Sequence, residues 1–368
     1  MFNISAYDKR ICLTDPQQPS SAIAPPIFQT SIFSFKTMAD FIAYRNKELT
    51  AYCYSRGDNP SCNLLEDKLA KLDCGEKCRV FSSGMGAITA VFISLLKSGD
   101  HILIVNDVYG PVQEYLQFLQ SYQISYNIIK VSETDDLEKY IRPNTKIIYT
   151  ESLGTMNFEF IDLVKIAAVA KSNNILSIID NTCLTPLLQK PLTFGFDIVV
   201  YSLSKYTGGH SDLIGGAVIS SNTIMQKINK YGFKLHGAVM SPHDAFLVLR
   251  GLRTLPSRLE ILYGTTCKVV EFLVNHAKVE QVLHPLTYDN ITKTKYYTQA
   301  KGITSLLSIQ LRTDNTQKIC QFIDNLATFH ITVSWGGYEN LIMVQNLQEL
   351  KKNTSKNVII RLALGLLD

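Results

Sequence analysis

Lys205 is the residue whose surroundings most clearly favour chemistry. It follows an apolar segment at 197–201, lies beside the hydroxyls of Ser202 and Ser204, and precedes Gly208-Gly209, where the chain can bend around a ligand. A lysine that is removed from water has a lowered pKa, and its neutral amine can form a Schiff base with a carbonyl. The alternative is a solvated surface lysine.

Two further features would place a carboxylate and a phosphate site near that lysine. The apolar segment Ile175–Asp180 ends in an acid, and residues 81–85 (Phe-Ser-Ser-Gly-Met) form a small-residue turn before an expected helix. A carboxylate that pairs with a ring nitrogen, and backbone donors that hold a phosphate, suit pyridoxal phosphate bound through Lys205. The simpler role for Asp180 is to cap the helix that follows it.

Apolar and amphipathic segments alternate over residues 51–240 and predict the elements that position these side chains. This alternation is typical of a doubly wound α/β domain with a mostly parallel sheet, in which ligands collect at the carboxyl ends of the strands. We expect strands at 101–105, 126–131, 146–150, 175–180, 197–201 and 215–220, and helices at 86–97, 112–122, 161–172 and 222–231.

The remaining residues divide into two smaller parts. Residues 1–50 are expected to form an N-terminal arm that is extended and then helical. Residues 241–368 are expected to form a smaller C-terminal α+β domain that begins with two helices, at 241–252 and 258–276.

The composition argues against several classes of protein. The 368 residues include 36 Lys and Arg against 32 Asp and Glu, and the longest basic cluster is Lys351-Lys352, so we expect no nucleic-acid partner. No apolar run approaches the ~20 residues of a membrane span, so we expect no membrane partner. Residues 1–10 lack the apolar run of a secretory signal, and the eight scattered cysteines lack zinc-site spacing. We therefore expect reduced thiols, no metal site and a cytoplasmic protein.

A series of motifs resembles the Cys/Met-metabolism pyridoxal phosphate enzymes, the fold-type-I group of cystathionine synthases and lyases. Residues 201–212, which contain Lys205, resemble the cofactor-lysine segment of that family. Within the family, residues 151–159 and 334–338 most resemble the bacterial cystathionine β-lyases. The other motifs match in order along the chain: Tyr54-Ser-Arg56-Gly-Asp-Asn-Pro60, Ser83-Gly84-Met85, Val108-Tyr109-Gly110, Glu151-Ser152, Asp180-Asn181-Thr182, Arg250-Gly-Leu-Arg-Thr-Leu255, Ser334-Trp-Gly-Gly-Tyr-Glu339 and Arg361-Leu-Ala-Leu-Gly-Leu366.

The resemblance implies a catalytic role for three side chains. Lys205 would bind pyridoxal 5'-phosphate covalently and, once released, would move the Cα proton of the substrate. Asp180, with Thr182 nearby, would pair with the ring nitrogen. Tyr109 would stack on the ring, and its phenol would help to activate the substrate amine or protonate the leaving sulfur. A core tyrosine is the alternative for Tyr109.

The resemblance also implies how phosphate and substrate are bound. Arg361 would clamp the substrate α-carboxylate with its planar guanidinium, in a pocket lined by Ser334 and Trp335. In this family the Tyr-x-Arg motif reaches the phosphate of a neighbouring subunit, which implies a homodimer with shared active sites, commonly within a homotetramer. A surface ion pair is the alternative for Arg56, and a structural core role is the alternative for Trp335. The expected phosphate-binding residues are Gly84, Met85, Ser202, Ser204, Tyr54 and Arg56.

This sequence departs from the family pattern at several positions. Cys183 stands where many relatives have Trp, Leu153 where Pro is usual, Thr155 where many have an Asn that bonds the ring hydroxyl, and Asn340 where Ser is common. These departures leave the mechanism intact but weaken inference about the substrate. The sequence also stops at Asp368, where relatives usually continue through another amphipathic helix, so we expect a shortened chain or a missing C-terminal cover.

The expected activity is β-elimination of L-cystathionine to homocysteine, pyruvate and ammonia, a step of transsulfuration and methionine biosynthesis. The residue before the Ser334 position is typically acidic in γ-lyases of this family and apolar or aromatic in β-lyases, and here it is Val333. The alternatives on the same scaffold are a γ-lyase, a γ-synthase or a sulfhydrylase. Alternatives of another class are a catalytically idle relative and a nucleotide-binding module, although Gly84-Met85-Gly86 lacks the third glycine of a dinucleotide loop.

Overall fold

The structure is a computed structural model that describes residues 2–16, 21–105, 108–154, 156–313, 315–345 and 358–366. Thr155, Lys351-Lys352 and Asp368, which the sequence singled out, lie outside the described residues.

The large domain is built on a seven-stranded sheet that confirms the expected α/β class. Neighbouring strands from β3 to β6 are parallel, whereas β7 is antiparallel to both β6 and β1. All six predicted strands are present within a residue or two of their expected bounds, and β1 is an additional strand. The order across the sheet is β1 (Lys77–Phe81), β7 (Gly216–Ser220), β6 (Ile198–Ser202), β5 (Leu176–Asp180), β4 (Thr145–Glu151), β2 (His101–Val105) and β3 (Ser125–Ile129).

Helices cover both faces of this sheet. In β2, Ile102 and Ile104 join one buried apolar cluster and Leu103 and Val105 join another, as alternating side chains of a strand with two buried faces should. The first cluster includes side chains of α4 (Gly84–Leu95), α5 (Gly110–Gln120) and α8 (Asn222–Ile228). The second includes side chains of α3 (Pro60–Leu72), α6 (Leu163–Ser172) and α7 (Thr185–Leu188).

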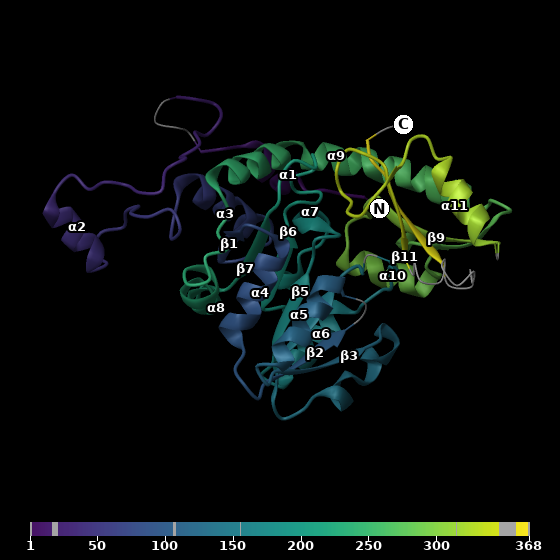
Figure 1. The fold of residues 1–368 in the computed structure, drawn as a ribbon, viewed down its shortest axis with the longest axis horizontal. Helices are drawn as coiled ribbons and strands as arrows, with labels where there is room; N and C mark the ends of the chain where they lie inside the picture. The colour runs from purple at the N-terminus through teal and green to yellow at the C-terminus, as the bar shows by residue number, and fades with distance from the viewer. Residues whose placement is uncertain are drawn as a thin grey trace.

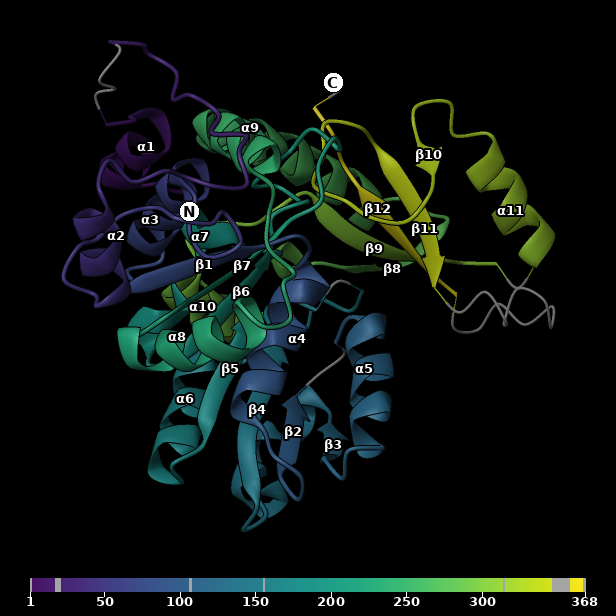
Figure 2. The ribbon, with the colours of Figure 1, turned by 60° about the vertical axis from the view of Figure 1, so that its left-hand side comes forward.

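The C-terminal part forms a second, smaller sheet, which Figure 2 shows beside the large domain with β10 and α11 at its outer side. Its pairs are antiparallel except β10 with β11. Its helices are α10 (Asn290–Gln299) and α11 (Thr316–Asp324). The strand order is β10 (His330–Ile331), β11 (Leu341–Gln345), β12 (Ile359–Ala363), β9 (Leu306–Leu311) and β8 (Val279–Leu283).

One long helix, α9 (Pro242–Val274), joins the two sheets and corrects the expectation of two helices at 241–252 and 258–276. Pro256 lies inside it, where a proline removes one helical hydrogen bond. The helix continues because Leu252, Leu255 and Leu259 are all fully buried on the same core, and this burial outweighs the lost bond.

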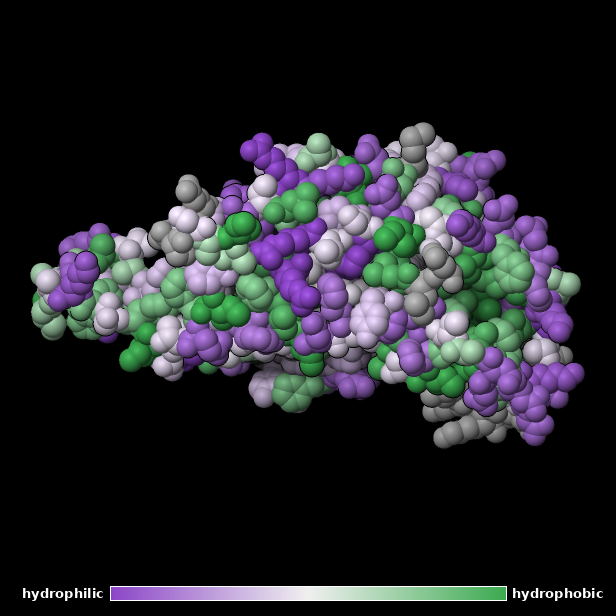
Figure 3. All heavy atoms as spheres, turned by 90° about the horizontal axis from the view of Figure 1, so that it is seen from above, coloured by the Kyte–Doolittle hydropathy of each residue, from purple (hydrophilic) through white to green (hydrophobic). Residues whose placement is uncertain are grey.

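The N-terminal arm begins with a helix that the sequence did not predict, α1 (Ala6–Leu13), which Ser5 caps at its start. The expected extended stretch follows, and the one helix that was expected in the arm is α2, at Met38–Arg45. Figure 1 shows α2 at the end of an arm that stands out from the rest of the chain, and Figure 3 shows green hydrophobic surface on that narrow extension. No residue of α2 is buried within the chain. An isolated eight-residue helix has only marginal stability in water, so α2 lacks the packing that usually stabilises a helix of this length.

Candidate active site

The carboxyl ends of β5 and β6 bring a carboxylate and two hydroxyls together. Asp180, the last residue of β5, accepts hydrogen bonds from the backbone N–H of Thr182, at 2.9 Å, and from its hydroxyl. The Thr182 hydroxyl in turn accepts from the N–H of Ser202, the last residue of β6, at 2.8 Å. Thr182 therefore fixes the Asp180 carboxylate relative to the segment that leads into Lys205.

Lys205 lies in the turn after β6, and its amine meets a loop of the C-terminal part. Its Nζ donates to Ser334 Oγ at 2.5 Å and lies 5.4 Å from the centre of the Trp335 ring. The loop approaches so closely that a Cβ on Gly336, whose φ is +87°, would lie 2.7 Å from the backbone nitrogen of Tyr206. Only glycine suits both the left-handed backbone and this contact.

The local environment changes the pKa of both charged groups. Burial, together with the charge of Arg361, lowers the pKa of Lys205 to about 8, and the charge of Asp180 opposes this shift. Burial raises the pKa of Asp180, against the hydrogen bonds from Thr182 and the charge of Lys205. Lys205 therefore has an appreciable neutral fraction at physiological pH, as a nucleophilic or basic lysine needs.

Arg361 of β12 has a buried guanidinium. Among the described residues, it donates to the Ser334 carbonyl at 2.9 Å and contacts the thioether sulfurs of Met343 at 3.5 Å and Met156 at 3.9 Å. Burial lowers its pKa. Sulfur is a weak acceptor, so these donors can be released to a carboxylate. By contrast, Arg253 of the Arg250–Leu255 motif is already paired with Asp15 at 2.8 Å.

The start of α4 offers backbone donors beside Ser202. Ser83 caps the helix by accepting from the N–H of Gly86 at 2.9 Å, and a Cβ on Gly84 would lie 3.0 Å from Ser202 Cβ. Gly84 and Met85 are thus the first helical residues, with N–H groups of the kind that bind a phosphate. Ser204 accepts from the N–H of Gly215 at 3.0 Å, so part of its hydrogen-bonding capacity serves the fold.

Tyr109 lies at the start of α5 with 54% of its surface exposed, which excludes the core-tyrosine alternative. Its N–H donates to a carboxylate oxygen of Glu151 at 2.6 Å. Glu151 is paired in register with Asp180, so Tyr109 is anchored at the same edge of the sheet. The sequence analysis included Glu151 in a family motif but did not predict this contact with Tyr109.

Tyr54 and Arg56 contact each other, with the guanidinium carbon 5.6 Å from the Tyr54 ring centre, and Arg56 donates to the Lys234 carbonyl at 3.1 Å. Tyr54 is 51% exposed. Among the described residues, neither side chain forms a hydrogen bond or a ring contact with Lys205, Ser334 or Trp335 of the same chain.

Sequence reasoning also missed Met156 and Met343, which contact Arg361. A methionine carries no sequence signal that separates a site residue from a core residue, and these two lie 187 positions apart. The place of Met343 beside the guanidinium follows from the pairing of β11 with β12, where Met343 is opposite Arg361, whereas Met156 comes from the segment after β4.

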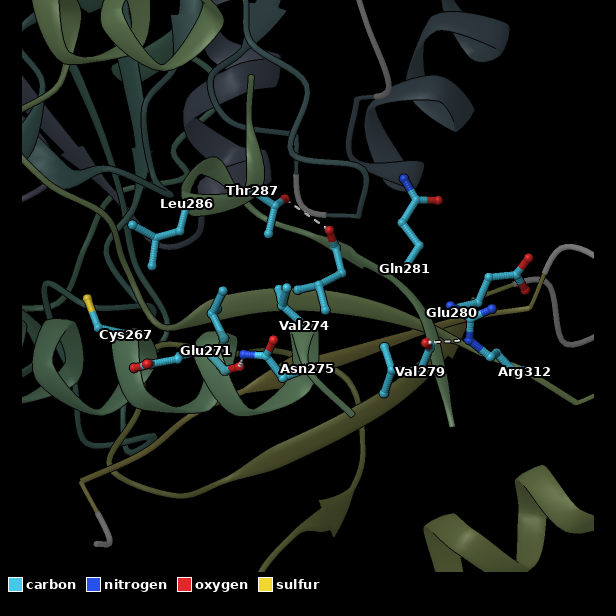
Figure 4. A pocket seen from close by; sticks show the side chains of 12 residues that line it. Cys267, Glu271, Val274, Asn275, Val279, Glu280, Gln281, Leu286, Thr287 and Arg312 are labelled. Atoms are coloured by element: carbon cyan, nitrogen blue, oxygen red, sulfur yellow. Dashed lines mark hydrogen bonds between the residues drawn. The ribbon is translucent and has the colours of Figure 1, made fainter. Parts of the chain in front are cut away.

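A separate cavity of about 620 Å³ lies in the C-terminal part, and none of the predicted site residues lines it. Figure 4 shows two of its polar side chains in local contacts: Thr287 donates to the Val282 carbonyl, and Arg312 donates to the Val279 carbonyl. Among the described residues, no group of three or more His, Cys, Asp and Glu is placed to hold a metal ion, and none of the described helices is long and apolar enough to cross a membrane.

Comparison with known proteins places these residues in a family. The model of the Cys/Met metabolism PLP-dependent enzymes matches residues 12–367. The chain belongs to this family. Its cofactor is therefore pyridoxal 5'-phosphate, the family prediction is confirmed, and the nucleotide-binding alternative is excluded. The residues fit the cofactor: an amine with a lowered pKa, a carboxylate one strand away and a glycine-bounded helix start.

Individual relatives carry out different reactions. The chain is 35% identical over 328 residues to a cystathionine γ-lyase of Bacillus subtilis, covering 89% of this chain and 84% of the relative. It is 34% identical over 357 residues to a cystathionine β-lyase of Lactococcus lactis subsp. cremoris, covering 94% and 90%. A putative O-acetylhomoserine (thiol)-lyase of Campylobacter jejuni, solved with a pyridoxyl-lysine monophosphate, superimposes with a TM-score of 0.88 at 26% identity, over 98% of this chain and 96% of that one. The reaction of this chain therefore remains to be proposed.

Proposed function

We propose that this enzyme is a carbon–sulfur lyase that cleaves L-cystathionine by β-elimination, giving homocysteine, pyruvate and ammonia in methionine biosynthesis. The observation that carries the proposal is the contact of both Lys205 and Arg361 with one residue, Ser334. It sets the amine beside the guanidinium that would hold an α-carboxylate, which suits removal of the proton on the adjoining Cα.

Each residue of the site has a role in this reaction. When bound, pyridoxal phosphate supplies an electron sink for the charge that develops at Cα. Asp180 holds the proton on the ring nitrogen, and Lys205, with a pKa of about 8, takes the Cα proton. Arg361 orients the substrate through a bidentate contact with its carboxylate. Tyr109, exposed at the edge of the site, would stack on the ring of the bound cofactor and would deliver a proton to the departing sulfur.

The phosphate is held by Gly84 and Met85 of α4 and by the hydroxyls of Ser202 and Ser204. Tyr54 and Arg56 complete the same cradle in a second copy of the chain, so the functional unit is a homodimer, and a homotetramer is formed from two such dimers. The exposed α2 and the absence of any contact between this pair and Lys205 in the described chain support that arrangement.

The free thiol of every cysteine suits the reducing cytoplasm. We propose one domain boundary near residue 50, between the N-terminal arm and the large domain. The second lies near residue 240, just before α9, between the large domain and the C-terminal domain.

The second candidate is γ-cleavage of the same substrate to 2-oxobutyrate, ammonia and cysteine, since γ-lyases are as similar to this chain as β-lyases. Val333 favours β-cleavage. Its side chain is 69% exposed beside Ser334 and offers no charge to a distal amino group.

Products formed from L-cystathionine test the proposal. We expect pyruvate and homocysteine in equal amounts, and no turnover by Lys205→Ala. Dominant 2-oxobutyrate and cysteine would reject β-cleavage and leave the family assignment intact. No reaction with cystathionine by the holoenzyme would reject this substrate altogether.

A further inference from the structure

Arg79 is a charged residue at the centre of strand β1, and only 6% of its surface is exposed. Its guanidinium donates to Glu66 of α3 at 3.1 Å and to Asp58 at 2.9 Å, and it lies over the Phe233 ring with 4.9 Å to the ring centre. A buried cation is tolerated when its partners are all in place. Arg79 thereby ties three separate segments to the edge of the sheet.

Two of these segments are the ones that set the position of Tyr54 and Arg56. Asp58 belongs to a tight turn in which the N–H groups of Gly57 and Asp58 both donate to the Tyr54 carbonyl, at 2.9 and 3.3 Å. On the other side, the carbonyl that accepts from Arg56 is that of Lys234, the residue after Phe233. Arg79 therefore contacts both the turn that carries Arg56 and the segment on which the Arg56 side chain rests.

Glu66 fixes the direction in which Arg79 points. Its carboxylate is 2% exposed, and its second oxygen accepts the N–H of Val80 at 3.1 Å, so both oxygens are held. The guanidinium can then present its second nitrogen to Asp58. A lysine has no planar fork and cannot reach both carboxylates in this way.

We propose that Arg79 is a positioning residue that holds the Tyr54 and Arg56 pair in the orientation required by the neighbouring subunit's cofactor phosphate. This rests on the proposed function, since it assumes that the pair serves a second copy of the chain. The effect of Arg79 is then exerted on the partner's active site and not on the site of its own chain.

Subunit exchange distinguishes a defect in the partner's active site from a defect in the active site of the same chain. Arg79→Lys should weaken pyridoxal phosphate binding by about tenfold or more, because charge-assisted bonds to the turn are lost. When this variant is mixed with Lys205→Ala, one site of each hybrid dimer combines an intact Lys205 with an intact arm. Random exchange in a twofold dimer should restore about a quarter of the wild-type sites. Both activity and the amount of tightly bound cofactor should rise on mixing.

Arg258→Lys is the matched control. Arg258 is buried as deeply, but it donates to the Tyr206 carbonyl at 2.7 Å, next to Lys205. Its defect therefore lies in its own site, and mixing with Lys205→Ala should restore nothing. Asp58→Asn, at the exposed end of the cluster, repeats the test should Arg79→Lys not fold, and should be rescued in the same way.

The outcomes separate this proposal from the one on which it rests. If Arg56→Ala is rescued by Lys205→Ala while neither Arg79→Lys nor Asp58→Asn is, Arg79 is structural and the proposal fails. Wild-type cofactor affinity in both variants would also overturn it. If Arg56→Ala itself is not rescued, the shared site is wrong, and the role of Arg79 falls with it.

Discussion

The lowered pKa of Lys205 predicts the pH dependence of cofactor capture. The neutral amine is the nucleophile, so capture should accelerate as pH rises through about 8 and level off above it. With a pKa of about 8, roughly a tenth of the amine is neutral at pH 7, whereas an ordinary lysine of pKa 10.5 would have about 0.03%. The site therefore gains about 300-fold in reactive amine at neutral pH.

The assay follows the fluorescence of Trp335 after apoprotein is mixed with pyridoxal phosphate. Trp335 is the single tryptophan and its ring centre lies 5.4 Å from the Lys205 amine, so its emission reports on this site. Two variants test the cause of the shift. Arg361→Leu removes a positive charge and should move the midpoint to higher pH, whereas Asp180→Asn removes a negative charge and should move it lower. Arg142→Leu is the control: Arg142 donates to Asn127, and removing its charge should leave the midpoint unchanged.

A midpoint near 10, or a rate that does not depend on pH between 6 and 9, would refute the buried, charge-coupled environment assigned to Lys205. A midpoint that Arg361→Leu leaves in place would show that burial alone lowers the pKa. The electrostatic contact between the amine and the carboxylate clamp would then be rejected.

Two further substitutions test the loop and the clamp. Arg361→Lys keeps the charge but loses the planar fork, so kcat/KM should fall by about two orders of magnitude while bound cofactor is retained; near-normal steady-state kinetics would show that Arg361 does not hold the substrate. Gly336→Ala would put a Cβ on a residue whose φ is +87°, only 2.7 Å from the backbone nitrogen of Tyr206. It should therefore lower the free energy of unfolding by about 1–3 kcal/mol and alter Trp335 emission. Gly264→Ala, in α9 with no atom within 4 Å of its Cβ position, should be neutral or stabilising, and equal effects of the two in chemical denaturation would contradict this reasoning.

The strands of the large sheet could be predicted because strands that are buried on both faces consist almost entirely of apolar residues. The segment at 101–105 is apolar at four of five positions, and the structure places β2 at the same residues. The prediction failed where a local rule was overridden by tertiary contacts. β1 was missed because Lys77 and Arg79 break its apolar pattern, and Arg79 is tolerated there only through ion pairs with partners distant in sequence. The interruption expected between the helices at 241–252 and 258–276 is likewise absent, because burial keeps α9 continuous through Pro256.

The site shows the same division. Asp180 and Lys205 could be predicted to lie at the same edge of the sheet, because Asp180 ends one strand and Lys205 follows the end of the adjacent parallel strand. The contact of Lys205 with Ser334 spans 129 positions and joins two separate sheets, so no spacing rule predicts it. The family resemblance supplied Ser334 and Arg361 as site residues, but the position of the Met343 thioether beside Arg361 depends on the register of β11 and β12.

The choice between β- and γ-cleavage depends on residues outside this common machinery. In the proposed mechanism Lys205, Asp180 and Arg361 would act on Cα, on the cofactor ring and on the α-carboxylate, and either reaction would need all three. Discrimination must therefore come from side chains that meet the distal arm of the substrate. We propose that Val333 and Tyr338, which flank the Ser334 loop and are more than half exposed, contact this arm. A scaffold arranged in this way can change its product through a few loop residues, which explains why relatives of equal similarity carry out different eliminations.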